Sequence, residues 1–209
     1  MDREALATAC RELALFPLPG VVLMPGSVLP LHVFEPRYQQ LVEHCLGGRP
    51  LCVPQIREDA GAEKAPELLP YSSVGVIGAH RRRPDGCFDI LVQPLGRVRL
   101  VSEHVSDTMY RVAEAELLED LPSDERALNR VGERIRGLFG MLVSSNESAV
   151  RGLAQVPTER LAEVLAAHVM EDVEDRQLFL AENDPLTRAL MVERSVLALV
   201  STRMPVAEG

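Results

Sequence analysis

The side chains in this sequence that could bind a metal ion or act as a general base are five histidines, spread along the chain. None of them has metal-binding spacing such as H-E-x-x-H. His168 precedes a run of acidic residues and could join a cation site, but a solvated acidic helix end explains the same pattern. We therefore expect no metal site. The histidines are His32, His44, His80, His104 and His168.

Nucleophilic chemistry would have to come from the cysteines, since no G-x-S-x-G elbow is present. The four cysteines contain no C-x-x-C pair, which predicts reduced, mostly buried thiols rather than disulfides or a zinc site. A pairing such as Cys52 with His32 would give an unrecognised hydrolase, but it needs an electropositive cleft that lowers the thiol pKa. We expect no enzymatic activity and no cofactor. The cysteines are Cys10, Cys45, Cys52 and Cys87.

The basic run of this sequence is Arg81-Arg82-Arg83, followed by the turn signal Pro84-Asp85-Gly86. A solvated hairpin tip is the ordinary interpretation. The alternative is an RNA contact, although stacking aromatics are not interleaved with the arginines and the net charge is −9. Nucleic acid is therefore an unlikely partner.

The composition is that of a globular protein, with 46% hydrophobic and 25% charged residues. The N-terminus lacks a signal-peptide pattern, and we see no apolar run of about 18 residues that would span a membrane. We expect a cytoplasmic chain with no membrane contact.

The first half of the chain, about 10–120, reads as short strands interrupted by Pro and Gly, which is typical of a bulged or barrel-like sheet. Helical spacing after Pro36 predicts one helix over about 36–46, and residues 57–70 read as a polar loop. The strands are expected at 13–16, 21–24, 28–34, 51–56, 74–80, 87–93, 97–105 and 110–118, with a bend at Pro94-Leu95-Gly96.

The second half, 121–205, reads as a helical domain. Ser123 is a plausible N-cap for a helix with an apolar stripe from Leu128 to Leu142. A helix opening at Thr158, a short segment at 175–182 and a last helix opening at Asp184-Pro185 follow.

Three segments resemble the substrate-binding domain of Lon-type ATP-dependent proteases. LALFPLPGVVLMPGSVLPLHVFEPRYQQLV at 13–42 is similar to the start of that domain, which carries V-V-L-F-P-G and F-E-P-R-Y patterns. The hairpin at 74–101 and the helices at 176–199 look like later parts of the family. The resemblance implies an α+β fold, with a PUA-like pseudo-β-barrel followed by an α-helical bundle.

The resemblance also implies that the chain binds unfolded or tagged polypeptides, as an adaptor or a quality-control factor that could work with a separate ATPase or protease. The ATPase and protease parts of Lon are expected to be absent. No G-x-x-x-x-G-K-[ST] loop is present, and Lys64 is the single lysine where a Walker lysine and a dyad lysine would require two.

A binder of many polypeptides needs exposed apolar area with a polar rim. The ordinary explanation of the segment Phe34-Glu35-Pro36-Arg37-Tyr38 is structural, with Glu35 as a helix cap and Tyr38 as a core residue. The functional alternative is that this corner borders such a groove. Apolar residues that flank turns or loops extend the candidate surface. The candidate residues are Met24, Phe34, Glu35, Arg37, Tyr38, Leu68, Leu69 and Tyr71, together with Leu23.

Overall fold

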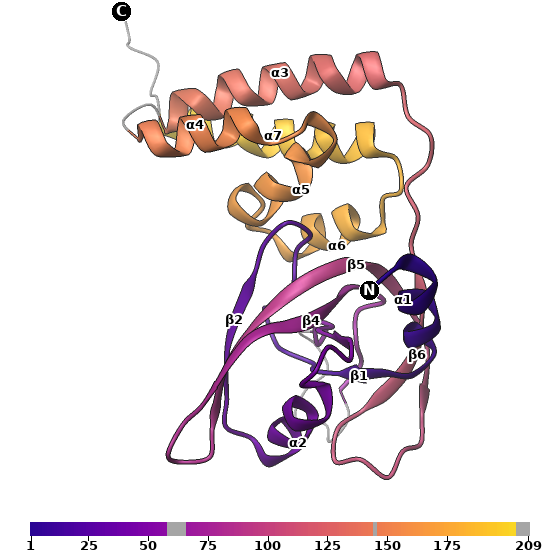
Figure 1. Cartoon of the computed structure of the whole chain (residues 1–209). Helices are drawn as coiled ribbons and strands as arrows, with labels where there is room; N and C mark the ends of the chain where they lie inside the picture. The colour runs from indigo at the N-terminus through magenta and orange to yellow at the C-terminus, as the bar shows by residue number, and fades with distance from the viewer. Residues whose placement is uncertain (58–65, 144–145, 204–209) are drawn as a thin grey trace, which may run out of the picture. The chain divides into compact units, whose positions relative to one another are not determined.

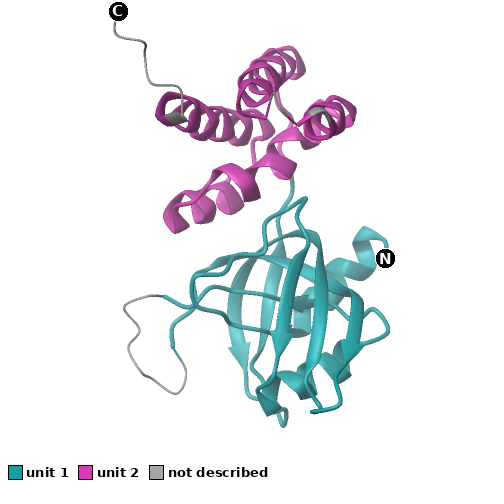
Figure 2. Cartoon of the chain, turned by 90° about the vertical axis from the view of Figure 1, so that its left-hand side faces the viewer, with its two compact units in different colours: residues 1–119 teal, residues 120–209 magenta. Residues whose placement is uncertain are grey.

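The protein consists of two units, Met1–Glu119 and Asp120–Gly209 (Figure 2). The computed structural model describes residues 1–57, 66–143 and 146–203. Part of the polar loop expected at 57–70, residues 58–65, lies outside the described residues.

The first unit is a mixed sheet with helices against it (Figure 1). The helix expected at 36–46 is present, and its buried residues follow the predicted spacing. The N-terminal helix was not expected. The elements are α1 (Arg3–Ala9), the 3-10 turn η1 (Cys10–Glu12), β1 (Leu13–Leu15), β2 (Leu29–Val33), α2 (Pro36–Cys45), β3 (Leu51–Cys52), β4 (Tyr71–Arg82), β5 (Phe88–His104) and β6 (Val112–Leu117).

The sheet closes into a ring. Its strand order is β2-β5-β4-β3-β1-β6, and an additional pairing of β5 with β6 joins the ends of the five-stranded part. β1 and β3 are parallel, and the other pairs are antiparallel. β2 lies outside the ring, beside the first part of β5 (Figure 1). A closed ring leaves few free strand edges.

The bend expected at Pro94-Leu95-Gly96 coincides with a bulge in β5, although the strand continues through it for 17 residues in all. The register with β4 shifts at this point, because Val74 pairs with Gly96 and Gly75 with Pro94, which leaves Leu95 as an extra residue on β5. Gly75 allows the backbones to approach closely there, since an added Cβ would lie 2.6 Å from the carbonyl oxygen of Gln93. A strand can therefore pass through a proline when it bulges at that position.

The strand expected at 21–24 is also absent. Gly20 and Gly26, on either side of this segment, have φ of 64° and 75°, which interrupts a pleated conformation. Val22, Leu23 and Met24 of this segment are nevertheless buried. These side chains are therefore buried by packing in the core, although the segment is not part of a strand ladder.

Two hydrophobic clusters pack the first unit. One joins α2 to the sheet, with Leu41, Val42 and Cys45 fully buried. The other joins α1 and η1 to the sheet through Leu6 and Cys10. These clusters fix the strands that carry the candidate site.

The second unit contains helices α3 to α7. Asp124 caps α3 by accepting from the Ala127 amide, so the predicted Ser123 cap is wrong by one residue. α4 was not expected from the sequence. Helix α7 contacts both α3 and α5. The helices are α3 (Glu125–Leu142), α4 (Glu147–Gln155), α5 (Thr158–Val169), α6 (Val173–Ala181) and α7 (Pro185–Arg203).

Within the described residues no helix is long and apolar enough to cross a membrane.

Candidate functional site

The candidate site is the outer face of β2, β5 and β4, where Pro30, His32 and Phe34 point away from the core. These three side chains are exposed, whereas the alternate residue Val33 is buried. The alternation follows from the period of a strand, which places successive side chains on opposite faces. We call this surface the outer face throughout.

An open hollow of about 620 Å³ lies on the outer face. Its apolar side chains include Pro30, Ala79 and Leu91, and its polar side chains include His32 and Arg81. Leu91 and Phe34 are both exposed, Phe34 with 64% of its surface. The residues that line the hollow are Pro30, Leu31, His32, Ala79, His80, Arg81, Asp89, Ile90 and Leu91.

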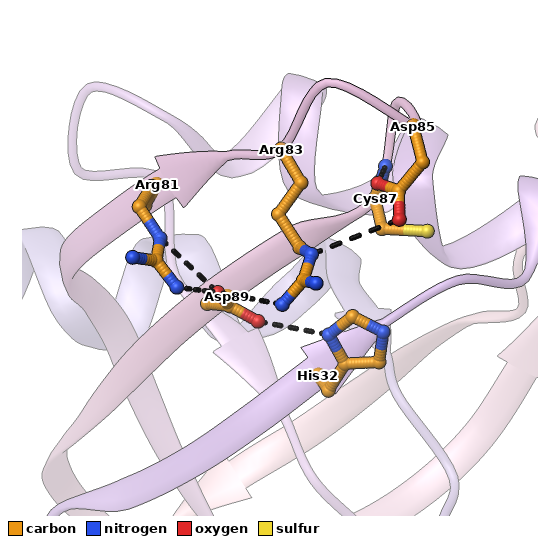
Figure 3. A network of polar contacts seen from close by, with 6 residues as sticks. All are labelled: His32, Arg81, Arg83, Asp85, Cys87 and Asp89. Carbon is orange, nitrogen blue, oxygen red and sulfur yellow. Dashed lines mark hydrogen bonds and ion pairs between the residues drawn. The ribbon is translucent and has the colours of Figure 1, made fainter.

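A polar network centred on Asp89 lies across the same strands (Figure 3). His32 is paired with Asp89 in the β2–β5 register, and Asp89 with Arg81 in the β5–β4 register. His32 Nδ1 lies 2.8 Å from one carboxylate oxygen, and Arg81 Nη2 donates to the other at 2.5 Å. Arg83 approaches the second oxygen to 3.6 Å. The carboxylate therefore links all three strands of the outer face.

These contacts stabilise the ionised form of Asp89. The hydrogen bonds from Arg81 and then from His32 lower its pKa to about 2. A depressed pKa in the folded state means that the network contributes to stability above the unfolded pKa of about 4, and that this contribution is lost as the pH falls through about 2. The Asp89 carboxyl is therefore ionised throughout the neutral pH range.

Replacing Arg81 by alanine should move the carboxyl titration of Asp89 from about 2 upward, toward the ordinary value of about 4. The measurement is a pH titration of the Asp89 carboxyl carbon by NMR. Arg82→Ala is the matched control, because Arg82 contacts Glu43 and the Phe88 ring. An equal midpoint in Arg81→Ala and the wild type would contradict the assigned network.

The arginine run at the hairpin tip is neutralised by neighbouring carboxylates. Arg82 lies 3.4 Å from Glu43, while Arg81 and Arg83 share Asp89. A phosphate backbone would have to compete with these ion pairs. The geometry therefore gives no support to the alternative of RNA binding through this hairpin.

The corner that follows β2 only partly matches expectation. Glu35 occupies the N-cap position of α2, but its carboxylate makes no capping hydrogen bond. Its Oε2 atom instead accepts two hydrogen bonds from Arg37, from Nη2 at 2.6 Å and from Nε at 2.9 Å. Tyr38 is a core residue, with its ring 4.3 Å from that of Phe16 and its hydroxyl donating to the Pro17 carbonyl.

The other predicted site residues are not gathered around Phe34. Met24 is 2% exposed, so it cannot contribute to a docking surface in this conformation, and Leu23 is buried as well. Leu68, Leu69 and Tyr71 are half-buried near the start of β4. Ten residues separate Tyr71 from Arg81 along β4, which is about 30 Å of strand.

The positions of Cys52 and His32 do not support the alternative that the chain is a hydrolase. The Cys52 thiol is buried in the core, and desolvation raises its pKa to about 12, whereas a nucleophilic thiol needs a lowered pKa. His32 is exposed and bonded to Asp89. Cys87, in the network of Figure 3, also has a raised pKa, first from desolvation and then from Asp85. In the described part of the chain, no three His, Cys, Asp or Glu residues converge as metal ligands.

Sequence reasoning missed Pro30, Ala79, Asp89 and Leu91. Pro30 was the signal in the sequence that could have located this surface, because a proline within a strand indicates a strand at the edge of a sheet. Its alternation with His32 and Phe34 could then have marked an exposed face on that edge.

Comparison with known proteins relates the chain to one domain of Lon proteases. The family model described as the ATP-dependent protease La (LON) substrate-binding domain matches residues 12–196. Lon protease 1 of Herpetosiphon aurantiacus is 26% identical over 212 residues, which cover 90% of this chain and 26% of that protein. Lon protease of Desulfovibrio desulfuricans is 29% identical, over 86% of this chain and 21% of that protein. The chain thus spans about a quarter of the length of these relatives.

Solved structures agree with the fold. The N-terminal domain of Mycobacterium avium complex Lon protease has a TM-score of 0.72 at 10% identity, covering 90% of this chain and 98% of that one. The Lon N-terminal domain protein from Xanthomonas campestris has a TM-score of 0.60 at 25% identity, covering 93% and 99%. The predicted α+β class, with a barrel-like sheet followed by helices, is confirmed. Since the family model covers most of the sequence, the chain belongs to the Lon substrate-binding domain family.

Proposed function

We propose that this chain is a non-catalytic module that captures extended segments of unfolded polypeptides by adding them as a strand to the free edge of β2. Membership of the Lon substrate-binding family supports substrate recognition as the general role. The observation that carries the finer proposal is that, in the described residues, β2 pairs with β5 alone. Its second edge is available for pairing.

The backbone of β2 is suited to receive a strand. Pro30 has no N–H, so its pair with Leu91 is of the kind that exchanges no ladder hydrogen bonds. Such pairs alternate along an antiparallel ladder, which makes His32 with Asp89 the same kind. The N–H and C=O of His32 and the C=O of Pro30 therefore face the free edge.

The side chains beside this edge offer weak and broad selectivity. The exposed Phe34 ring stacks beside His32, with 6.1 Å between centroids. An added strand would place alternate side chains on the outer face, where the apolar parts of the hollow and the charged network both lie. Main-chain hydrogen bonds give affinity that does not depend on the client sequence, and this suits a receptor for unfolded chains.

In this proposal the chain holds its clients without altering them, and acts as an adaptor or quality-control factor. The buried Cys52 with its raised pKa and the single lysine, Lys64, are in accord with a role without catalysis. Unfolding or cleavage of a captured client would then fall to a separate ATPase or protease.

The sharpest test removes one outward N–H. His32→Pro should bind a dye-labelled small protein, kept unfolded by reduction and carboxymethylation, about tenfold more weakly than His32→Ala does. Both variants lack the imidazole, and the proline additionally lacks the hydrogen bond and fills the edge. A main-chain hydrogen bond contributes about 1 kcal/mol, and steric hindrance adds to its loss. Fluorescence anisotropy gives both dissociation constants.

Circular dichroism and thermal melting check that the two variants are equally folded. The inward ladder of β2 should be unaffected, because residue 32 donates to the free edge. Equal affinities of folded His32→Pro and His32→Ala would rule out strand addition at β2.

A further inference from the structure

The second unit contains a groove that the proposed function does not use. It has a volume of about 500 Å³ and lies along α6 and α7, beyond the end of α5. Its lining is part apolar and part charged. The lining residues are Met170, Asp175, Leu178, Glu182, Met191, Arg194, Ser195 and Ala198.

The groove has two walls with helical spacing. On the α6 side, Asp175, Leu178 and Glu182 follow one another at steps of three and four residues, and on the α7 side Met191, Ser195 and Ala198 do the same. Each wall therefore runs for about 10 Å, or two helical turns. A groove of this length between two helices has room for about two turns of a partner helix, which would present anchors at i, i+3 or i+4, and i+7.

The apolar contacts available in the groove are adaptable and exposed. Leu178 has 59% of its surface exposed although it lies on the wall of a concavity. Met170 and Met191 add flexible, polarizable side chains that conform to different partners. The small Ser195 and Ala198 allow a partner backbone to approach α7 closely.

Charge indicates what kind of helix would fit. The α6 wall begins and ends with the carboxylates Asp175 and Glu182, and Glu171, Asp172 and Glu174 precede or accompany them in the sequence. The cation in the lining is Arg194, on α7. A partner with basic residues along its α6-facing edge would complement this field.

We propose that this groove binds an amphipathic helix of a partner protein, with an apolar stripe against Leu178 and Met191 and Lys or Arg along the edge that faces α6. The occupant is a folded helix, whereas β2 takes an extended strand. A second copy of this chain is disfavoured, because it would bring its own acidic α6 wall to an already acidic one. The groove thus supplies a way to recruit a partner independently of client capture.

The first experiment uses the full chain and a stapled 18-residue helical peptide that carries a leucine stripe and arginines along one flank. Binding is measured by fluorescence anisotropy, with a peptide of the same composition and a scrambled stripe as the reference. We expect Leu178→Asp to weaken binding at least tenfold. Leu190→Asp is the matched control, because Leu190 is an exposed leucine of α7 outside the lining. Equal effects of the two substitutions would overturn the proposal.

The second experiment exchanges the charges. Asp175→Arg should weaken binding of the arginine peptide and strengthen binding of a version with glutamate at the arginine positions. Unchanged preference would overturn the proposed orientation against α6. Circular dichroism confirms that the variant remains helical.

Two further outcomes identify a different occupant. Self-association in analytical ultracentrifugation that Leu178→Asp abolishes would assign the groove to a second copy, against the proposal. Competition between the unfolded client protein and the helical peptide would likewise assign it to client capture. Retention of peptide binding in His32→Pro supports an independent site and separates this test from that of β2.

Discussion

Replacing Asp120 by alanine is expected to lower the free energy of unfolding of the helical unit by about 3 kcal/mol. Asp120 makes a bidentate pair with Arg188, with both hydrogen bonds at 2.8 Å. The Arg188 side chain is only 2% exposed and lies over the Phe179 ring. Removal of the carboxylate leaves a buried guanidinium that keeps a hydrogen bond to the Glu182 carbonyl at 3.0 Å and lies 3.9 Å from the Glu163 carboxylate.

Glu119→Ala is a matched control for this prediction, since it removes the neighbouring carboxylate. Glu119 pairs with Arg3 at 2.6 Å, but both side chains are largely exposed. Exposed pairs contribute about 0–1 kcal/mol, so little change is expected. Urea unfolding followed by circular dichroism at 222 nm, with hydrogen exchange of α7, measures both. Similar effects of the two substitutions would show that the burial of Arg188 does not determine how much its ion pair contributes to the free energy of unfolding.

The second large effect is expected at Gly75. An added Cβ would lie 2.6 Å from the carbonyl oxygen of Gln93 and 2.9 Å from a methyl carbon of Val92. The nearest atom belongs to the backbone of β5, so relief requires the strand itself to move. We expect Gly75→Ala to destabilise the first unit by about 3 kcal/mol, at the upper end for overpacking.

Gly78→Ala is the natural comparison, because Gly78 lies on the same strand. There the Cβ would meet the side-chain amide of Gln93, which is exposed and can turn toward solvent. The lower entropy of the unfolded alanine chain offsets the remaining cost. Thermal unfolding should therefore separate the two variants by more than 10 °C. A Gly75→Ala protein as stable as Gly78→Ala would contradict the close approach at the bulge.

Local signals in the sequence predicted those elements whose ends are set by single residues. Pro36 marks the start of α2, and Pro84-Asp85-Gly86 marks the β4–β5 turn, because proline and glycine restrict or permit particular backbone angles. The α1 helix was missed, since its short sequence buries only Leu6. Helix α4 was missed because its stripe is short and weakly buried.

The candidate site was harder to predict because it depends on register. His32, Asp89 and Arg81 are far apart in sequence and meet only through the pairing of three strands. Phe34 was identified from the resemblance and Tyr38 was weighed as a core residue, but Met24 could not be recognised as buried from its local sequence. Whether a residue beside a turn is exposed depends on which cluster covers it, and that is a property of the tertiary structure.

The closure of the ring by β6 has a consequence for synthesis on the ribosome. β1, near the N-terminus, pairs with β3 on one side and with β6 on the other. One of its edges therefore stays unpaired until residues 112–117 have left the exit tunnel. At about 5–20 residues per second, that interval lasts several seconds. During this time the nascent chain carries an open apolar strand, and this is the stage at which a chaperone would be most useful to it.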